Sequence, residues 1–278
     1  MILHCLGRTL DLVRPVVMGV LNVTPDSFSD AGRYLDFDAA LRRAEAMAEE
    51  GAAIIDIGGE STRPGAEPVP VQQELDRVIP LVEALGRRVP AAISVDTSKP
   101  QVMAEAIRAG AAMINDVQAL QAPGAIEVLA QSRAAVCLMH MQGTPRTMLQ
   151  NPVYADVVGE VRDFLDRRIQ ACAAAGIGRQ RLCVDPGFGF GKTLQHNLTL
   201  LGRLGELRRL GVPLLVGLSR KSTIGALTGA PVSDRLYGSL AAAVIAAWQG
   251  AAIIRAHDVG PTVQALAVCG ALLHEPQT

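Results

Sequence analysis

Eight short apolar runs, rich in valine and isoleucine, recur along the chain and constrain its fold more than any other feature. Continuous hydrophobicity over so few residues suits strands that are buried on both faces, as in a parallel sheet. The runs cover residues 15–23, 52–59, 91–96, 111–117, 134–140, 181–186, 213–219 and 251–258.

Amphipathic helical patterns lie between most of these runs. Apolar stripes at helical spacing run through residues 39–50, 71–85 and 153–165, the last beginning at Val153. Pro80 is expected to kink or split the second helix, because proline removes a hydrogen bond and clashes with the preceding turn. Gly51 and Gly176 are the expected stops after the first and third stripes.

Eight strands alternating with helices in about 250 residues predict an α/β protein of the (β/α)8 TIM-barrel class. No linker or low-complexity tract divides the chain, so residues 1–278 are expected to form a single domain. A doubly wound open sheet is the alternative fold. It usually has fewer strands, and the dinucleotide-binding fingerprint that would favour it is absent.

Composition narrows the function classes. The 278 residues are 49% hydrophobic and 19% charged, with a formal net charge of −1, which allows a large core. That balance gives no sign of a nucleic-acid or membrane partner, so any anionic ligand must be met by a local cluster of charge. The longest apolar run, 240–248, is too short to span a bilayer.

Cysteine usage indicates a reducing compartment. The five cysteines are odd in number and far apart, with no Cys-x-x-Cys pair that would suggest zinc. The first residues, MILHCLGRTLDL, lack the basic start and long apolar core of a signal peptide. A cytoplasmic location is therefore expected.

A glycine-rich stretch, DPGFGFGK at residues 185–192, raises the question of nucleotide binding. Neither the P-loop nor the dinucleotide fingerprint fits its glycine spacing. Instead, Asp185 ends the sixth apolar run, and the loop after it is expected to carry Phe188 and Phe190 over the barrel mouth. An exposed phenylalanine there could cover an aromatic substrate, and ordinary packing under the loop is the alternative.

Polar residues close all eight apolar runs, where a barrel places its active site. Aspartate and asparagine suit the amide-like edges of a flat heterocycle, whereas arginine, histidine and lysine suit an anion. The alternative is that strand ends simply meet solvent. In order, the residues are Asn22, Asp56, Asp96, Asn115, His140, Asp185, Ser219, Arg255 and His257.

Eight stretches, spread over nearly the whole chain, occur together and in a fixed order. They are MGVLNVTPDSFSD (18–30), IIDIGGESTRPG (54–65), SVDTSKP (94–100), INDV (114–117), CLMHMQGTP (137–145), DPGFGFGK (185–192), GLSRKSTIG (217–225) and IIRAHDVG (253–260). In this order they resemble the dihydropteroate synthase family. The resemblance implies a (β/α)8 barrel that joins 4-aminobenzoate to 7,8-dihydropterin-6-ylmethyl diphosphate with Mg²⁺, releases diphosphate, acts as a homodimer and is a sulfonamide target.

The resemblance also implies residue roles. The pterin would be read by Asp96, Asn115, Asp185 and Lys221, and the diphosphate would be bound by Asn22, Arg255 and His257. Asn22 would also ligate Mg²⁺ through a hard oxygen. Three alternatives stay open: Asp96 as a helix N-cap, Lys221 as a solvated surface lysine, and His257-Asp258 as the N-cap of the last helix.

Two loops and two strand ends would serve the second substrate. By resemblance, the aminobenzoate site comprises Thr62, Arg63, Pro64, Phe190 and Ser219. The loops 24–32 and 60–65 read as mobile lids, with plain connection as the alternative. In the first of them, Phe28 and Asp30 are the expected lid residues, and Asp30 would close onto the metal site.

The implied chemistry is a dissociative displacement without a covalent enzyme intermediate. Its expected catalytic residues are Asp96, Asp185, Lys221, Arg255 and His257. Two rival functions remain: a folate-dependent methyltransferase barrel, and a catalytically silent pterin-binding module. The first would not need the Arg255 and His257 anion site, and the second would be expected to lose Asn22, Lys221 or Arg255.

Overall fold

The computed structural model describes residues 1–23, 33–61, 65–144, 146–148 and 150–273. The predicted lid residues Phe28 and Asp30, and the predicted aminobenzoate residues Thr62, Arg63 and Pro64, lie outside these ranges.

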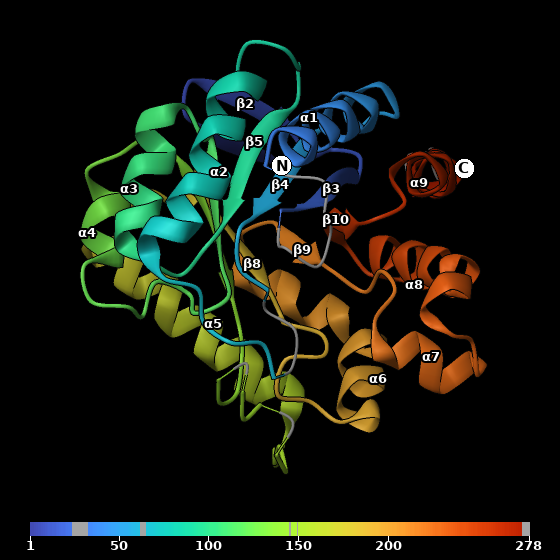
Figure 1. The fold of residues 1–278 in the computed structure, drawn as a ribbon. Coiled ribbons are helices and arrows are strands. Elements are labelled where there is room, and N and C mark those ends of the chain that lie inside the picture. Colours follow the sequence, from blue (N-terminus) through green and yellow to red (C-terminus); the bar gives the residue numbers. More distant parts are fainter. Residues whose placement is uncertain (24–32, 62–64, 145, 149, 274–278) are drawn as a thin grey trace.

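Eight parallel strands close into a barrel, in the order β10-β3-β4-β5-β6-β7-β8-β9 with β10 paired to β9 (Figure 1). All eight apolar runs form strands, which confirms the predicted TIM barrel. The strands are β3 (Val16–Asn22), β4 (Ile54–Gly58), β5 (Ala92–Asp96), β6 (Met113–Asp116), β7 (Ala135–Met139), β8 (Leu182–Asp185), β9 (Leu214–Val216) and β10 (Ala251–Ala256).

Helices surround this barrel, as Figure 1 shows. None within the described ranges is long and apolar enough to cross a membrane. The α-helices are α1 (Arg33–Glu49), α2 (Val71–Leu85), α3 (Pro100–Ala109), α4 (Ala125–Ala130), α5 (Val157–Ala174), α6 (Leu194–Gly202), α7 (Ser222–Thr228), α8 (Leu236–Trp248) and α9 (Val259–Leu273). Short 3-10 helices cover Arg179–Arg181, Leu204–Leu210 and Val232–Asp234.

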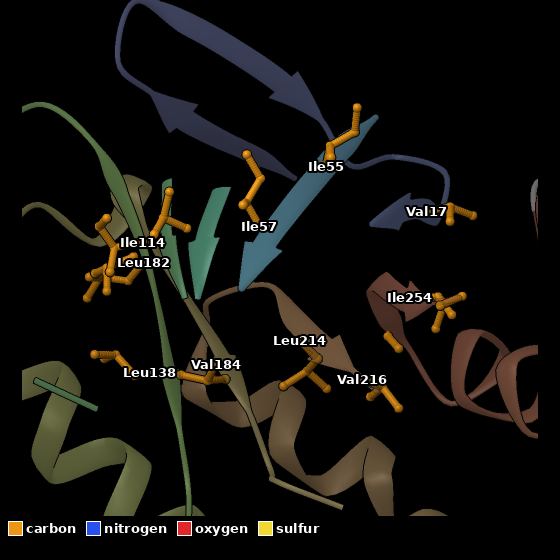
Figure 2. Close-up of a cluster of buried hydrophobic side chains, with 14 of the residues drawn as sticks. Val17, Ile55, Ile57, Ile114, Leu138, Leu182, Val184, Leu214, Val216 and Ile254 are labelled. Carbon is orange, nitrogen blue, oxygen red and sulfur yellow. The ribbon is translucent and has the colours of Figure 1, made fainter. Parts of the chain in front are cut away.

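Alternate strand residues divide the core into two clusters. On β4, Ile55 and Ile57 belong to the large cluster between strands and helices, part of which Figure 2 shows, whereas Ile54 belongs to a second cluster inside the barrel. Side chains alternate between the two faces of a strand. Asp56 therefore shares the inward face of Ile54, and the same period turns Asp96, two positions after Ser94, toward the barrel axis.

A hairpin that the sequence analysis did not predict packs on the interior cluster. Strands β1 (Ile2–Cys5) and β2 (Arg8–Asp11) pair antiparallel, and Leu3, Cys5 and Leu12 are buried in that cluster. The backbone N–H of Leu6 donates to the carbonyl of Arg133, just before β7, at 3.0 Å. The hairpin thus covers the amino-terminal end of the barrel, opposite the predicted active site.

The expected split at Pro80 is wrong, because α2 runs uninterrupted from Val71 to Leu85. Buried residues lie on both sides of the proline, among them Val78 and Leu81. Interior proline costs a helix about 3 kcal/mol. Burying two or more large aliphatic side chains stabilises by a comparable or larger amount, so the packing of this face prevails.

The stripe that was predicted to begin at Val153 begins four residues later. Val153 is 64% exposed and precedes α5, whose first residue is Val157. A carboxylate of Glu160 accepts the N–H groups of Ala155 at 2.7 Å and Asp156 at 3.0 Å. This local cap fixes the start of the helix after Asp156, and the spacing of apolar residues alone could not reveal it.

Candidate active site

Strand register brings the predicted polar residues to one level of the barrel. Gly58 pairs with Asn22 on one side and with Asp96 on the other, and Asp96 pairs with Asn115. A Cβ on Gly58 would lie 3.3 Å from the side-chain oxygen of Asn22 and 3.8 Å from the Cβ of Asp96. The glycine therefore leaves open the space between these two side chains.

Arg255, on β10, joins carboxylates from two other strands. Its Nε donates to Oδ2 of Asp56 at 2.7 Å, and its Nη2 donates to Oδ2 of Asp96 at 2.9 Å. Asn115 Nδ2 donates to the same Oδ2 of Asp56 at 3.0 Å. Burial opposes the charged guanidinium, but Asp56 and Asp96 outweigh it and raise the pKa of Arg255 above its ordinary value.

Two carboxylate oxygens in this network have no protein partner. Oδ1 of Asp56 and Oδ1 of Asp96 are buried and accept no hydrogen bond within the described residues. Leaving such an acceptor unpaired costs roughly 1–3 kcal/mol, more for a charged group. Burial raises the pKa of Asp96 to about 7, against the attraction of Arg255. These oxygens can accept N–H donors from a ligand inside the barrel mouth.

Asp185 and Lys221 face the same site from β8 and the loop after β9. Burial raises the pKa of Asp185 against the attraction of Lys221, and Oδ1 of Asp185 accepts the Gly187 N–H at 2.7 Å. The Lys221 ammonium donates to the Phe188 carbonyl and lies 4.6 Å from the centroid of the Phe190 ring. Burial lowers the pKa of Lys221 to about 8, so Lys221 is not a solvated surface lysine.

His257 and Ser219 are in direct contact beside Arg255. The backbone N–H of His257 donates to Ser219 Oγ at 3.2 Å, and its ring Nδ1 lies 3.1 Å from the same oxygen. The carboxylate of Asp258 binds Arg220, with Nε to Oδ2 at 3.0 Å. A residue predicted for the diphosphate and one predicted for the aminobenzoate are therefore neighbours.

One of the two phenylalanines predicted to cover the mouth does not do so. Phe188 is fully buried in the cluster between strands and helices, so the packing alternative is correct for it. The N–H of Gly189 donates to Asn197 Oδ1 at 2.9 Å, which holds this part of the loop against α6. Phe190 is partly exposed and lies beside Lys221, and its role over the mouth stays a prediction.

The alternative that Asp96 is the N-cap of the following helix is wrong. Helix α3 begins at Pro100, with Lys99 in the capping position and no side-chain cap. The Asp96 carboxylate binds Arg255 instead.

The sequence analysis missed a partly buried ion-pair network next to the site. Lys99 donates to both Glu60 and Glu74, and Glu74 is fully buried, with no partner for its Oε1 within the described residues. The other oxygen of Glu60 accepts the Val69 N–H at 3.2 Å, which ties the two ends of the β4–α2 connection together. Lys99 and Glu60 stand in quoted stretches, but only the position of α2 brings Glu74 to them.

Asn22 was predicted to ligate Mg²⁺, and its surroundings can be compared with what that ion needs. Its amide oxygen is a hard ligand, and the missing side chain of Gly58 leaves room next to it. No group of three or more His, Cys, Asp or Glu side chains in the described part of the chain could hold a metal ion. A Mg²⁺ ion often keeps one or two protein ligands and completes its shell with phosphate and water, so the residues fit the ion.

The fold and this ring of acceptors and cations define a pterin-binding barrel, and residues 18–257 match the model of the pterin binding enzyme family. The dihydropteroate synthase of Escherichia coli strain K12 is 55% identical over 267 residues, covering 96% of this chain and 95% of that protein. The chain therefore belongs to the dihydropteroate synthase family. A Synechocystis dihydropteroate synthase is 44% identical over 261 residues, covering 93% of this chain and 90% of that protein.

Solved structures agree with this assignment. The Yersinia pestis dihydropteroate synthase in a sulfonamide drug complex has a TM-score of 0.94 and 53% identity, covering 99% of this chain and 100% of that one. The Xanthomonas albilineans enzyme with 4-aminobenzoic acid has a TM-score of 0.93 and 53% identity, with 99% of both chains covered. The same enzyme with 7,8-dihydropteroate has a TM-score of 0.90 and 50% identity, covering 99% of this chain and 100% of that one.

Proposed function

We propose that the barrel mouth described above is where this chain condenses a dihydropterin with 4-aminobenzoate. As a dihydropteroate synthase, the chain is a transferase of folate biosynthesis. The substrates are 7,8-dihydropterin-6-ylmethyl diphosphate and 4-aminobenzoate, and the products are 7,8-dihydropteroate and diphosphate. The observation that carries this site is the pair of unpartnered carboxylate oxygens of Asp56 and Asp96, held beside one arginine.

The pterin binds to Asp96, Asn115, Asp185 and Lys221. Its amine and amide-like edges present several N–H donors, which suit acceptors that have no protein partner. Ionised Asp96 and Asp185 also favour a cationic pterin, because they lie in a buried site where charge interactions are less screened than in water. The ring of Phe190 lies at the side of this pocket, next to Lys221.

The diphosphate binds to Arg255, His257 and Asn22. The two hydrogen bonds of Arg255 to carboxylates use two of its five N–H donors, so donors remain for phosphate oxygens. Asn22 would hold Mg²⁺, which supplies additional positive charge for the leaving diphosphate when bound. Strands β3 and β10 are paired, which brings these residues together although they are far apart in the sequence.

The reaction is a dissociative displacement. The bond between the pterin methylene and the diphosphate oxygen breaks first, and the electron pair leaves with the diphosphate. Arg255 and His257 stabilise that departing charge, while the dihydropterin ring spreads the positive charge left on the methylene. The aniline nitrogen of 4-aminobenzoate then attacks the methylene and loses a proton, with no covalent bond to the enzyme.

The second substrate binds to Phe190 and Ser219, and Thr62, Arg63 and Pro64 complete its site as the family resemblance implies. The contact of Ser219 with His257 supports this arrangement, because it joins the aminobenzoate side to the diphosphate side. Phe28 and Asp30 act as lid residues. Because sulfonamides are analogues of 4-aminobenzoate, we expect them to compete for this same subsite.

Residues 1–278 form one domain, in the cytoplasm, as a homodimer. The single closed barrel supports one domain, and five unpaired buried cysteines are typical of a reducing compartment. Support for the homodimer comes from exposed apolar residues on α8 and α9, which are considered in the Discussion.

Turnover of the two substrates tests the proposal. Purified protein with both substrates and Mg²⁺ should release dihydropteroate and diphosphate, and EDTA should abolish this. Arg255→Ala should lower kcat/KM by about 10²–10³-fold, because it removes charge stabilisation of the leaving group. Arg162→Ala is the matched control, since Arg162 lies on α5 and forms an ion pair with its neighbour Asp163.

Other outcomes would point to the rivals. Pterin binding without product would favour a silent binding module, and methyl transfer to or from a folate would favour the methyltransferase barrel. A pterin–enzyme adduct in the mass spectrum would exclude the dissociative mechanism without a covalent intermediate.

A further inference from the structure

Lys192, the last residue of the DPGFGFGK stretch, is buried with only 3% of its surface exposed, and burial lowers the pKa of its amine to about 7. A buried ammonium is costly unless it is hydrogen-bonded. Its Nζ lies 2.9 Å from the Gly187 carbonyl oxygen, 3.0 Å from the Phe190 carbonyl oxygen and 3.0 Å from His140 Nδ1. An ammonium has three N–H donors, so these three acceptors saturate it.

His140 completes this set as a neutral acceptor. Burial lowers the pKa of His140 to about 3, and Lys192 adds to the effect. When Lys192 is protonated, its ammonium carries only donors, so Nδ1 of the ring then presents its lone pair to Lys192. The ring is packed edge-on against Phe164, with centroids 4.9 Å apart, so the acceptor is held in place.

The loop between Asp185 and Lys192 lies tightly against the loop that follows β7. Gly187 and Gly191 have φ values of +70° and +62°. A Cβ on Gly187 would lie 1.9 Å from the His140 carbonyl oxygen, and one on Gly191 would lie 2.4 Å from the Gln142 carbonyl oxygen. Only glycine therefore fits at positions 187 and 191. The buried carbonyl groups of the loop need a hydrogen-bond donor from within the protein.

Both functional ends of the loop connect to Lys192. At the first end, Gly187 accepts from Lys192 through its carbonyl and donates from its N–H to the Asp185 carboxylate. At the second end, the carbonyl of Phe190 accepts from Lys192, while its ring lies beside Lys221. One ammonium thus fixes the backbone of the turn at both ends.

We propose that Lys192 is a positioning residue that shapes the Gly187–Phe190 turn and so holds the Phe190 ring against the aminobenzoate. The inference rests on the proposed function, because it takes Phe190 as part of the aminobenzoate site. Lys192 itself touches neither substrate in this proposal. Asp185 is affected less, because it is also held by its place on strand β8.

Steady-state kinetics of Lys192→Met test this role. We expect KM for 4-aminobenzoate to rise by about 10- to 100-fold, because small displacements of a positioning group cost that much. KM for the dihydropterin diphosphate should rise by less than KM for 4-aminobenzoate: Lys221 donates to the Phe188 carbonyl in the same turn, but Asp185 and Asn115 are held by strands. The control is Ile169→Val in the buried face of α5, which loses core packing without touching the loop and should keep both KM values.

Amide hydrogen exchange gives a second readout that does not depend on turnover. In Lys192→Met, the peptide covering residues 186–193 should exchange at least about tenfold faster than in the native protein, while Ile169→Val should leave it unchanged. If Lys192→Met does not fold, His140→Leu removes one of the three acceptors and should shift the same KM and the same peptide, by less.

Failure of the inference is distinct from failure of the proposed function. An active native enzyme whose soluble Lys192→Met or His140→Leu variant keeps the aminobenzoate KM and the exchange of residues 186–193 would overturn the positioning role. A native protein that neither turns over nor binds 4-aminobenzoate would instead count against the proposed function.

Discussion

At the scale of single residues, Asp96 combines two properties that proteins rarely bring together. One of its oxygens binds Arg255, and the other is buried and accepts no hydrogen bond from the part of the chain that the structure describes. Burial raises its pKa to about 7, and the nearby carboxylate of Asp56 adds to that rise. A carboxyl group with so perturbed a pKa in a barrel mouth is typical of a functional site.

Pterin affinity should therefore depend on pH through Asp96. Only the ionised carboxylate offers all its oxygens as acceptors, so protonation below about pH 7 should weaken binding. Between about pH 6 and pH 7.5 we expect affinity to rise by about fivefold to tenfold, as for one group titrating near 7. Isothermal titration calorimetry with a pterin measures this change.

Asp96→Asn is the control for that experiment. Its amide does not titrate, so it should bind more weakly and lose the contribution of Asp96 to the pH dependence, while any titration of the pterin itself remains. A native affinity profile that coincides in shape with that of Asp96→Asn would contradict the role given to this carboxyl group.

At the scale of elements, the β1–β2 hairpin shows how a barrel floor is made. Leu3, Cys5 and Leu12 belong to the same buried cluster as the inward residues Met18 and Ile253. The interior of a small barrel is packed with side chains, and its amino-terminal face contributes to stability whereas chemistry takes place at the other face. The hairpin is therefore expected to affect folding alone.

Substitutions at two adjacent hairpin positions test whether the hairpin affects stability and not turnover. Leu3 is fully buried and Ile2 is 51% exposed. Leu3→Ala should lower the free energy of unfolding by about 2–5 kcal/mol, because it leaves a cavity in the interior cluster. Ile2→Ala should change it by less than about 0.5 kcal/mol.

Urea unfolding measures both values, and the kcat/KM of the folded Leu3→Ala protein should equal that of the native enzyme. A loss of turnover in folded Leu3→Ala would mean that the floor of the barrel and the mouth are coupled.

At the scale of the whole molecule, one face of the barrel carries a line of exposed apolar residues. Tyr237, Ile245 and Trp248 recur at helical spacing on α8, and Val268 and Leu272 do so on α9, which packs beside α8. Exposed apolar side chains that gather on two neighbouring helices are typical of a protein–protein interface. It supports the proposed homodimer, with a second copy of the chain as the partner.

Sedimentation equilibrium should give about twice the 29.3 kDa mass of one chain. Trp248→Glu should shift the protein toward the monomer, because it places a charge in the interface where desolvation is costly. Val13→Glu is the matched control, since Val13 is 56% exposed but precedes β3 at the other end of the chain. A native protein that sediments as a monomer would end the dimer proposal.

The sequence by itself determined the barrel and which strand-end side chains meet at its mouth. Eight apolar runs can be counted along the chain, and strand ends in a barrel meet at one face, so the sequence places Asp96, Asn115 and Arg255 together. The glycine spacing of residues 185–192 likewise excluded two nucleotide-binding motifs. These features are local or periodic, and local patterns can be read from one chain.

Only the tertiary structure decided which side chains are partners. The Lys99–Glu60–Glu74 network, the burial of Phe188 and the three acceptors of Lys192 each depend on atoms from several segments. The uninterrupted course of α2 through Pro80 and the packing of the β1–β2 hairpin depend on burial in the same way. Long-range packing and desolvation set these outcomes, and neither leaves a periodic signal in the sequence.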